Sequence, residues 1–306
     1  SVTVNADNSG QTVTQGSGSA VPDEAPVITQ RESSVETGNT ITINAAENAT
    51  ANVTISDVNI NTSGKSGKSE AAVSTNGKGN VNIELDGTNT LKSGRNHAGL
   101  EKNSDGNQGK LTITDENENG KLIATGGSDA AGIGGGYCGD GNDITIAGGK
   151  VTATGGNYGA GIGGGNHGNG RNITITDGEV TAAGGTNGAG IGGGLRKNGE
   201  KITVSGDATL KVQGGPTDTW DGAGAGIGNG GSHNGEFSGS FIPVNGAETE
   251  PDTSNLTTGK IEYYAPGADM TKDEPTSTTL GSGQPEPVSP GETAAPVEYR
   301  MQTSAS

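Results

Sequence analysis

Short segments in which apolar and polar residues alternate recur along the middle of the chain. Each has the form Ile-Thr-Ile or a close variant, and six copies lie at Asn52–Ser56, Asn80–Glu84, Lys110–Thr114, Asp143–Ala147, Asn172–Thr176 and Lys201–Ser205. Alternation with a period of two is typical of a β-strand that is buried on one face. The pattern therefore predicts a short strand about every 30 residues.

A glycine-rich hexamer keeps the same period. Ala-Gly-Ile-Gly-Gly-Gly occurs at Ala131–Gly136, Ala160–Gly165 and Ala189–Gly194, each 29 residues after the last, and a near copy lies at Ala225–Gly230. Each unit has room for two or three short strands and their turns, and none for a helix. Because so thin a unit cannot bury its own apolar face, it must stack on its neighbours.

We therefore predict an all-β protein, a single parallel β-helix (β-solenoid) of about seven coils. The solenoid is expected over residues 39–245, after an extended N-terminal segment, 1–38. Residues 246–306 are rich in Pro, Thr, Ser and Glu and are expected to form a C-terminal tail. The tail holds two short strand-like pieces, Ile261–Tyr264 and Val297–Arg300.

The hexamer is expected to be a structural corner. Its isoleucine would point inward, so that Ile133, Ile162 and Ile191 stack in one column. Its glycines would allow a sharp turn close to the neighbouring coils. We assign this corner role to Gly134, Gly163, Gly192 and Gly228.

The period fails near the end of the array, where the insertion Pro216–Gly224 replaces a three-residue loop. The next coil carries the two phenylalanines of the chain, Phe237 and Phe241. Large apolar residues at the end of a repeat array usually cover its exposed core. We expect both phenylalanines to cap the solenoid.

Composition narrows the classes of function. The net charge of −17 excludes a nucleic-acid partner and an anionic membrane surface, because both need a basic face. Apolar runs are too short for a membrane helix, which needs about 18 residues, so no membrane insertion is expected. Cys138 is the single cysteine, so no disulfide can form within the chain.

The sequence predicts no cofactor, no metal ion and no catalytic residue. Gly159–Gly163 lacks the helix that a dinucleotide-binding glycine motif requires, and it recurs serially. A weaker alternative places Ca²⁺ at Asp140 and Asp143, in half of a calcium-roll motif. The histidines, His97, His167 and His233, are expected to be solvated loop residues.

The insertion also suggests a ligand site. Trp220 and Asp221 lie in it and are expected to project beside Tyr137 and Tyr158, which occupy neighbouring loops. An aromatic ring can stack on a sugar and a carboxylate can hold its hydroxyls, so these four residues are candidate glycan-binding residues. In the alternative, Trp220 folds over the edge of the coil as packing.

The corner Gly159–Gly165, with the Ile-Thr-Ile and Val-Thr-Ala-Thr-Gly-Gly segments, resembles the glycine-rich repeats of large surface proteins of anaerobic Gram-positive bacteria. Many of those are described as adhesin-like or carbohydrate-binding. The resemblance covers about residues 80–235. It implies a bacterial protein at the cell surface or outside the cell, and carries over no catalytic residue.

Three functions remain open at this stage. The first is a secreted, non-enzymatic structural or adhesive protein that self-associates into a homo-oligomer or filament through its tails and solenoid edges. The second is a glycan-binding module of a surface adhesin. The third is a β-helix glycosidase or polysaccharide lyase, which requires two carboxylates about 5–10 Å apart in a groove.

Overall fold

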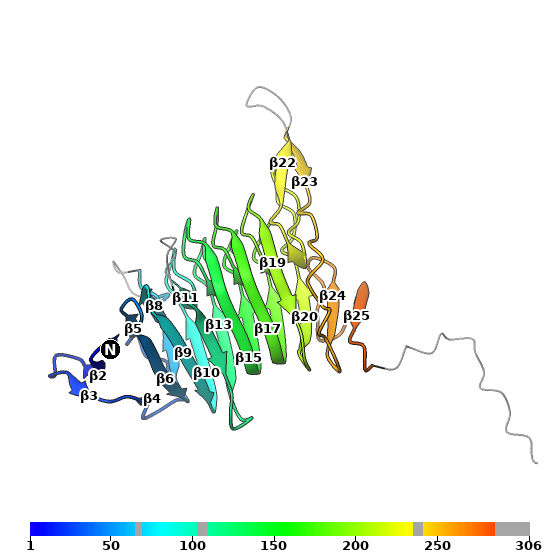
Figure 1. Cartoon of the computed structure of the whole chain (residues 1–306). Helices are drawn as coiled ribbons and strands as arrows, with labels where there is room; N and C mark the ends of the chain where they lie inside the picture. The colour runs from blue at the N-terminus through cyan, green and yellow to red at the C-terminus, as the bar shows by residue number, and fades with distance from the viewer. Residues whose placement is uncertain (65–68, 103–108, 235–240, 285–306) are drawn as a thin grey trace, which may run out of the picture.

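Stacked strands form a parallel β-solenoid in the computed structural model of the chain (Figure 1). The structure describes residues 1–64, 69–102, 109–234 and 241–284. This part of the chain holds strands and turns and no helix. The coils follow one another along one axis for about six turns, close to the seven expected. The predicted fold class is confirmed.

One ladder of parallel strands contains the glycine hexamers. In order along the axis its members are β1 (Val2–Asp7), β5 (Ile41–Ala45), β8 (Val73–Gly77), β11 (Leu100–Lys102), β14 (Ile133–Gly134), β16 (Ile162–Gly163), β18 (Ile191–Gly192) and β21 (Ile227–Gly228). The pairing register places Ile162 between Ile133 and Ile191, and all three side chains are fully buried. The inward isoleucine column lies where the sequence predicted it.

A second sheet has two arms that meet at a corner. The first arm contains β4 (Val27–Thr29), β6 (Thr50–Ser56), β9 (Asn80–Asp86), β12 (Leu111–Thr114) and β19 (Gly199–Val204). The other arm contains β7 (Asn59–Asn61), β10 (Thr88–Lys92), β13 (Lys121–Thr125), β20 (Thr209–Gln213) and β24 (Lys260–Tyr264). Two long strands, β15 (Gly141–Thr154) and β17 (Gly170–Ala183), run through both arms and shift register at the corner.

Glycine at the hexamer corner is required by the backbone. Gly163 has φ +132°, and a Cβ atom there would lie 2.1 Å from the carbonyl oxygen of Gly192 in the next coil. Gly134, Gly192 and Gly228 have φ values of +131°, +137° and +139°. A residue with a side chain would be strained by this φ and would push the coils apart.

The N-terminal segment continues the solenoid. β1 pairs in parallel with β5, and its other edge pairs with β2 (Gly10–Gln15), which pairs with β3 (Val21–Pro22). Val4 and Ala6 are buried, because the alternation in β1 matches that of the coil beside it. The first sheet ends on a two-residue strand whose Pro22 lacks an N–H, a common way to blunt an edge.

The first part of the C-terminal tail, residues 246–284, folds back on the last coil. The Glu248 carboxylate accepts the backbone N–H groups of Gly226 and Ile227 at 2.7 and 3.0 Å. In earlier coils the equivalent N–H groups donate to the next coil. β24 pairs in parallel with β20, and β25 (Ser277–Leu280) pairs with β24 in the antiparallel sense. The expected strand Val297–Arg300 lies outside the described residues.

The expectation that Phe241 caps the core is wrong. Its ring makes edge-on contacts with His233, at 4.5 Å between ring centroids, and with Trp220, at 5.2 Å. These residues belong to the projecting region that contains the hairpin of β22 (Ser232–Asn234) and β23 (Ile242–Val244) (Figure 1). Ile261 and Leu256 are buried in the last layer instead. Phe237 lies outside the described residues.

Candidate functional site

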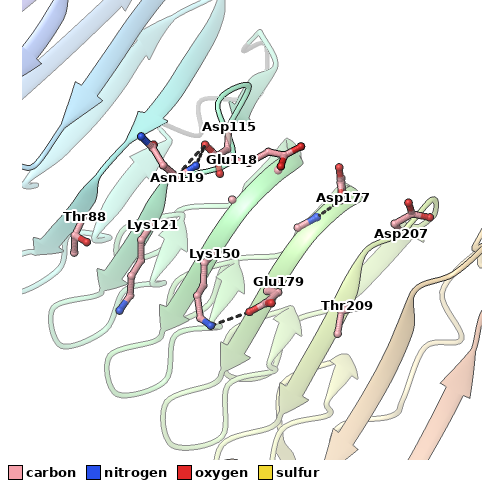
Figure 2. A pocket seen from close by; sticks show the side chains of 14 residues that line it. Thr88, Asp115, Glu118, Asn119, Lys121, Lys150, Asp177, Glu179, Asp207 and Thr209 are labelled. Carbon is pink, nitrogen blue, oxygen red and sulfur yellow. Dashed lines mark hydrogen bonds and ion pairs between the residues drawn. The ribbon is translucent and has the colours of Figure 1, made fainter.

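A groove of about 680 Å³ crosses successive coils at the corner between the two arms of the second sheet (Figure 2). We call it the corner groove. Its walls carry five carboxylates and two ammonium groups, those of Asp115, Glu118, Asp177, Glu179, Asp207, Lys121 and Lys150. The lining has no aromatic residue.

Glycines at the corner form part of this hollow. Gly149 and Gly178 have φ values of +86° and +92°, so the turn itself selects glycine. A Cβ atom on Gly178 would lie 2.5 Å from the carbonyl oxygen of Gly149. Because side chains are absent here, the polar residues on either side of the turn stand above a recessed backbone.

Two rows of side chains follow the groove. In the first, the register pairs Lys121 with Lys150, Lys150 with Glu179, and Glu179 with Thr209. Figure 2 shows this row beside a second, which contains Asp115, Asp177 and Asp207. Successive coils are about 5 Å apart along the axis, the spacing of hydrogen-bonded strands. Asp177 and Asp207 are therefore one step apart, whereas Asp115 and Asp177 are two steps apart.

The carboxylates of the second row are held in place by local donors. Asp115 accepts the N–H groups of Asn119 and Gly120, at 3.2 and 2.9 Å. Asp177 accepts the N–H of Gly178 at 2.7 Å. The row is therefore an array of oriented acceptors with lone pairs left for a ligand's hydroxyl or amine groups.

Asp207 is held by residues 246–284, the part of the tail that folds back on the last coil and that we call the C-terminal cap. Its carboxylate accepts the hydroxyls of Thr257 and Thr258, and these hydrogen bonds lower the pKa of the Asp207 carboxyl. The side chain therefore stays ionised at neutral pH and acts as an acceptor.

The first row contains an exposed ion pair that a ligand could displace. Lys150 and Glu179 form an ion pair at 2.8 Å, with 63% and 68% of their side-chain surfaces exposed. A pair this exposed contributes at most about 1 kcal/mol to stability, so both groups can exchange partners with a ligand.

The structure places Asp221, one of the four predicted glycan-binding residues, in the protein interior. Its carboxylate receives two hydrogen bonds from Arg196, each 2.8 Å, and a third contact from His233 at 2.8 Å. Burial raises the pKa of the Asp221 carboxyl, but hydrogen bonds from Arg196 and His233 outweigh burial and keep it below its ordinary value. Asp221 therefore holds the insertion to the neighbouring coil.

The three aromatic candidates lie on the loops at one end of the coils. Trp220 is 54% exposed and Tyr137 is 52% exposed, while Tyr158 is half-buried. Three strand-to-strand steps separate the hexamer isoleucine before Tyr137 from the one after Trp220, roughly 14 Å. None of the three lines the corner groove.

Asp140 and Asp143, the candidate calcium ligands, face asparagines of the next coil. Asp140 accepts the N–H of Asn169 at 2.7 Å, and Asp143 accepts the Asn172 amide at 3.0 Å. Within the described ranges, no three His, Cys, Asp or Glu side chains are grouped so that they could hold a metal ion.

Two of the three histidines are not simply solvated, which corrects the expectation. His233 contacts Asp221, and the Nδ1 atom of His97 lies 2.9 Å from a Glu101 carboxylate oxygen. A hydrogen bond to Glu101 raises the pKa of His97. Cys138 is a free, exposed thiol.

Sequence reasoning missed the corner groove because each of its acids looks like an ordinary turn residue. The 29-residue spacing of the repeats nevertheless contained a signal for this groove. When the turns after each Ile-Thr-Ile are superposed at 29 residues, Lys150 and Glu179 fall at one position. Polar residues that recur at one position beside a glycine turn indicate a row of side chains on the surface of the stacked coils.

Part of the repeat array matches a known family of repeats. Residues 118–137, 144–166 and 173–195 match the family model described as a beta helix repeat. The chain contains β-helix repeats. These repeats contribute Lys121, Lys150 and Glu179 to the corner groove. No curated protein and no solved structure matches the chain. Among the described residues, no helix is long and apolar enough to cross a membrane.

Proposed function

We propose that the chain is a non-enzymatic adhesive element of an extracellular surface protein, and that it binds a linear glycan along the corner groove. The β-helix fold is compatible with surface proteins and with enzymes, so the proposal depends on the groove. Its main support is the in-register stacking of the coils, which sets polar side chains in two rows along the groove. One coil step of about 4.8 Å is close to the length of one hexose, so successive sugars would lie over successive coils and reach the polar side chains of both rows.

The charges of the groove restrict the glycan. Five carboxylates face two ammonium groups, within a chain of net charge −17. A polyanionic polysaccharide would be repelled by this surface. A neutral glycan offers hydroxyl donors to Asp115, Asp177 and Asp207 and can accept from Lys121 and Lys150. We therefore propose a neutral linear glycan.

Affinity electrophoresis through soluble neutral and anionic polysaccharides tests the proposal. We expect retardation by at least one neutral polysaccharide and by none of the anionic ones. The double variant Asp177→Asn/Glu179→Gln should weaken that retardation about tenfold, the effect of losing about 1.4 kcal/mol. The control Glu32→Gln changes one exposed acid at the N-terminal end and should leave retardation unchanged. Binding that is equal in the double variant, or confined to polyanions, would refute the proposal.

Hydrolysis of the glycan is the second candidate function. The coil spacing places Asp177 about 5 Å from the Asp207 level and about 10 Å from the Asp115 level, within the range used by glycosidases. A general acid, however, needs a carboxyl kept protonated by burial. The Asp207 pKa is lowered, and Asp177 is exposed. Release of reducing ends by the native chain, lost in Asp177→Asn, would favour the enzyme.

Self-association into a homo-oligomer remains a prediction. The first large sheet ends at β3 and β21 and the second at β4 and β25, and residues 246–249 already cover β21, the last hexamer strand. An assembly through an edge of the two large sheets would therefore begin from β3, β4 or β25. A single monomeric mass by light scattering at high protein concentration would contradict it.

A further inference from the structure

A second cavity, of about 650 Å³, lies within the C-terminal cap. We call it the cap cavity. One wall is the segment 248–253, and the others are β24, β25 and the turns beside them. Its volume falls in the range of sites for small organic ligands, about 300–1,000 Å³. The sequence predicted a tail at these residues and no site.

The cap cavity has a fixed framework. Glu248 is tied to the backbone of the last hexamer, as described above, and the Thr276 hydroxyl donates to the Tyr263 carbonyl at 3.0 Å. The Tyr263 ring packs against Gly226, where an added Cβ would lie 3.0 Å from a ring carbon. A cavity whose walls are already held loses little entropy when a ligand binds.

Tyr263 supplies an unused polar group. Its side chain packs partly against the hydrophobic core, and the hydrogen bonds found for Tyr263 among the described residues use its backbone and not its phenol. Burial, followed by the charges of Glu248 and Glu250, raises the pKa of Tyr263 to about 12. The phenol therefore keeps its proton at physiological pH and can donate to a ligand.

The remaining lining sets the sign of the ligand's charge. Glu248 and Glu250 carry two negative charges, and the lining contains no lysine, arginine or histidine. Hydroxyl groups of Thr249, Thr253, Ser277 and Thr279 surround them, and Pro251 and Pro266 add apolar surface. Both Glu248 oxygens already accept backbone N–H groups, so Glu250 is the carboxylate placed to meet a ligand. An aromatic ring, hydroxyls and this carboxylate together match a sugar ring that bears a positive charge.

We propose that the cap cavity binds a saccharide that carries a free amino group, with the ammonium beside Glu250 and the sugar ring against Tyr263. This site is separate from the corner groove, and it does not depend on glycan binding there. An N-acetylated sugar of the same shape lacks the charge and would leave the carboxylate without a partner.

Calorimetric titration with a glucosamine disaccharide and its N-acetylated counterpart tests the proposal, because the two ligands differ in charge. We expect the amino form to bind about tenfold more tightly, a difference of about 1.4 kcal/mol. Glu250→Gln should abolish that preference. Tyr263→Phe should weaken both forms by a similar factor, since it removes only the phenol oxygen.

Two controls separate the cap cavity from general attraction of a cation to an acidic protein. Glu47→Gln removes one exposed charge near the N-terminal end and should leave the preference unchanged. Thermal melting shows that each variant is folded. The proposal is overturned if neither ligand binds, if both forms bind equally, or if Glu47→Gln reduces the preference as much as Glu250→Gln.

Discussion

Replacement of Gly163 by alanine should break the solenoid at its middle, although the change adds one methyl group. Gly163 has φ +132°, and its added Cβ would lie 2.1 Å from the Gly192 oxygen, whereas real Cβ contacts are essentially never below 3.0 Å. That oxygen accepts the N–H of Gly164 at 2.9 Å. The next coil must therefore move, which weakens this hydrogen bond and its neighbours.

The magnitude follows from two costs. Backbone strain at this φ costs about 1–3 kcal/mol. Each disturbed hydrogen bond between the coils costs about 1 kcal/mol more, and at least two are affected. We expect a loss of about 3–5 kcal/mol in the free energy of unfolding. Gly267 provides a matched control, because its φ is +81° and no atom lies within 4 Å of its added Cβ. Gly267→Ala should cost only about 1–2 kcal/mol.

Urea unfolding followed by circular dichroism measures both variants, with the slope compared to detect any loss of cooperativity. A repeat array can open at one interface, so a broadened transition in Gly163→Ala also fits the argument. If the two variants lose the same free energy with the same slope, the corner does not require glycine for the reason given.

Three further predictions concern stability. Ile162→Ala, at a fully buried site, should lower the free energy of unfolding by about 2–5 kcal/mol, and Ile162→Val by about 1 kcal/mol, in the same urea assay; near-equal losses would contradict the packed column. Asp221→Asn should lower the free energy of unfolding by about 1–3 kcal/mol, because Arg196 loses its ionic partner. The loss is limited because the Arg196 side chain is 41% exposed, and an unchanged melting temperature would refute this prediction. The hydrogen bond to Glu101 raises the pKa of His97 above 6.5. The contribution of this contact to the stability of the fold is therefore complete below pH 6.5, and it is lost as the pH rises through the folded-state pKa. His97→Gln should therefore destabilise the protein more at pH 5 than at pH 8, and an equal effect at both values would contradict it.

The middle of the fold was predictable because one residue pattern determines both the strands and their stacking. Ile144, Ile173 and Ile202 recur with the period and pair in the structure, so each strand's register follows from its neighbour's. The glycine corner was predictable for the same reason. Repetition turns a weak local signal into a strong one.

The ends were less predictable because they do not repeat. Leu256 and Ile261 are isolated apolar residues in a segment rich in Pro and Thr, and composition suggested a tail. Glu248 caps a strand through its side chain, which no pattern of apolar residues reveals.

The candidate sites were hidden for a third reason. The corner groove joins side chains from different coils, so its rows appear only once the register is known. Asp221 was chosen for its place beside Trp220, but burial of its carboxylate depends on Arg196, which lies one coil away.

The in-register stacking gives this protein an adjustable length. Residues 160–188 form one whole 29-residue unit, and their removal would join Gly159 to Ala189, a junction with the same sequence as the original. Neither end of the rod takes part in that junction. A gene could therefore shorten or lengthen the rod by whole steps of about 4.8 Å through recombination between repeats. Each step would remove or add one position along the corner groove, so the same event that changes the reach of the rod would also change the length of the groove.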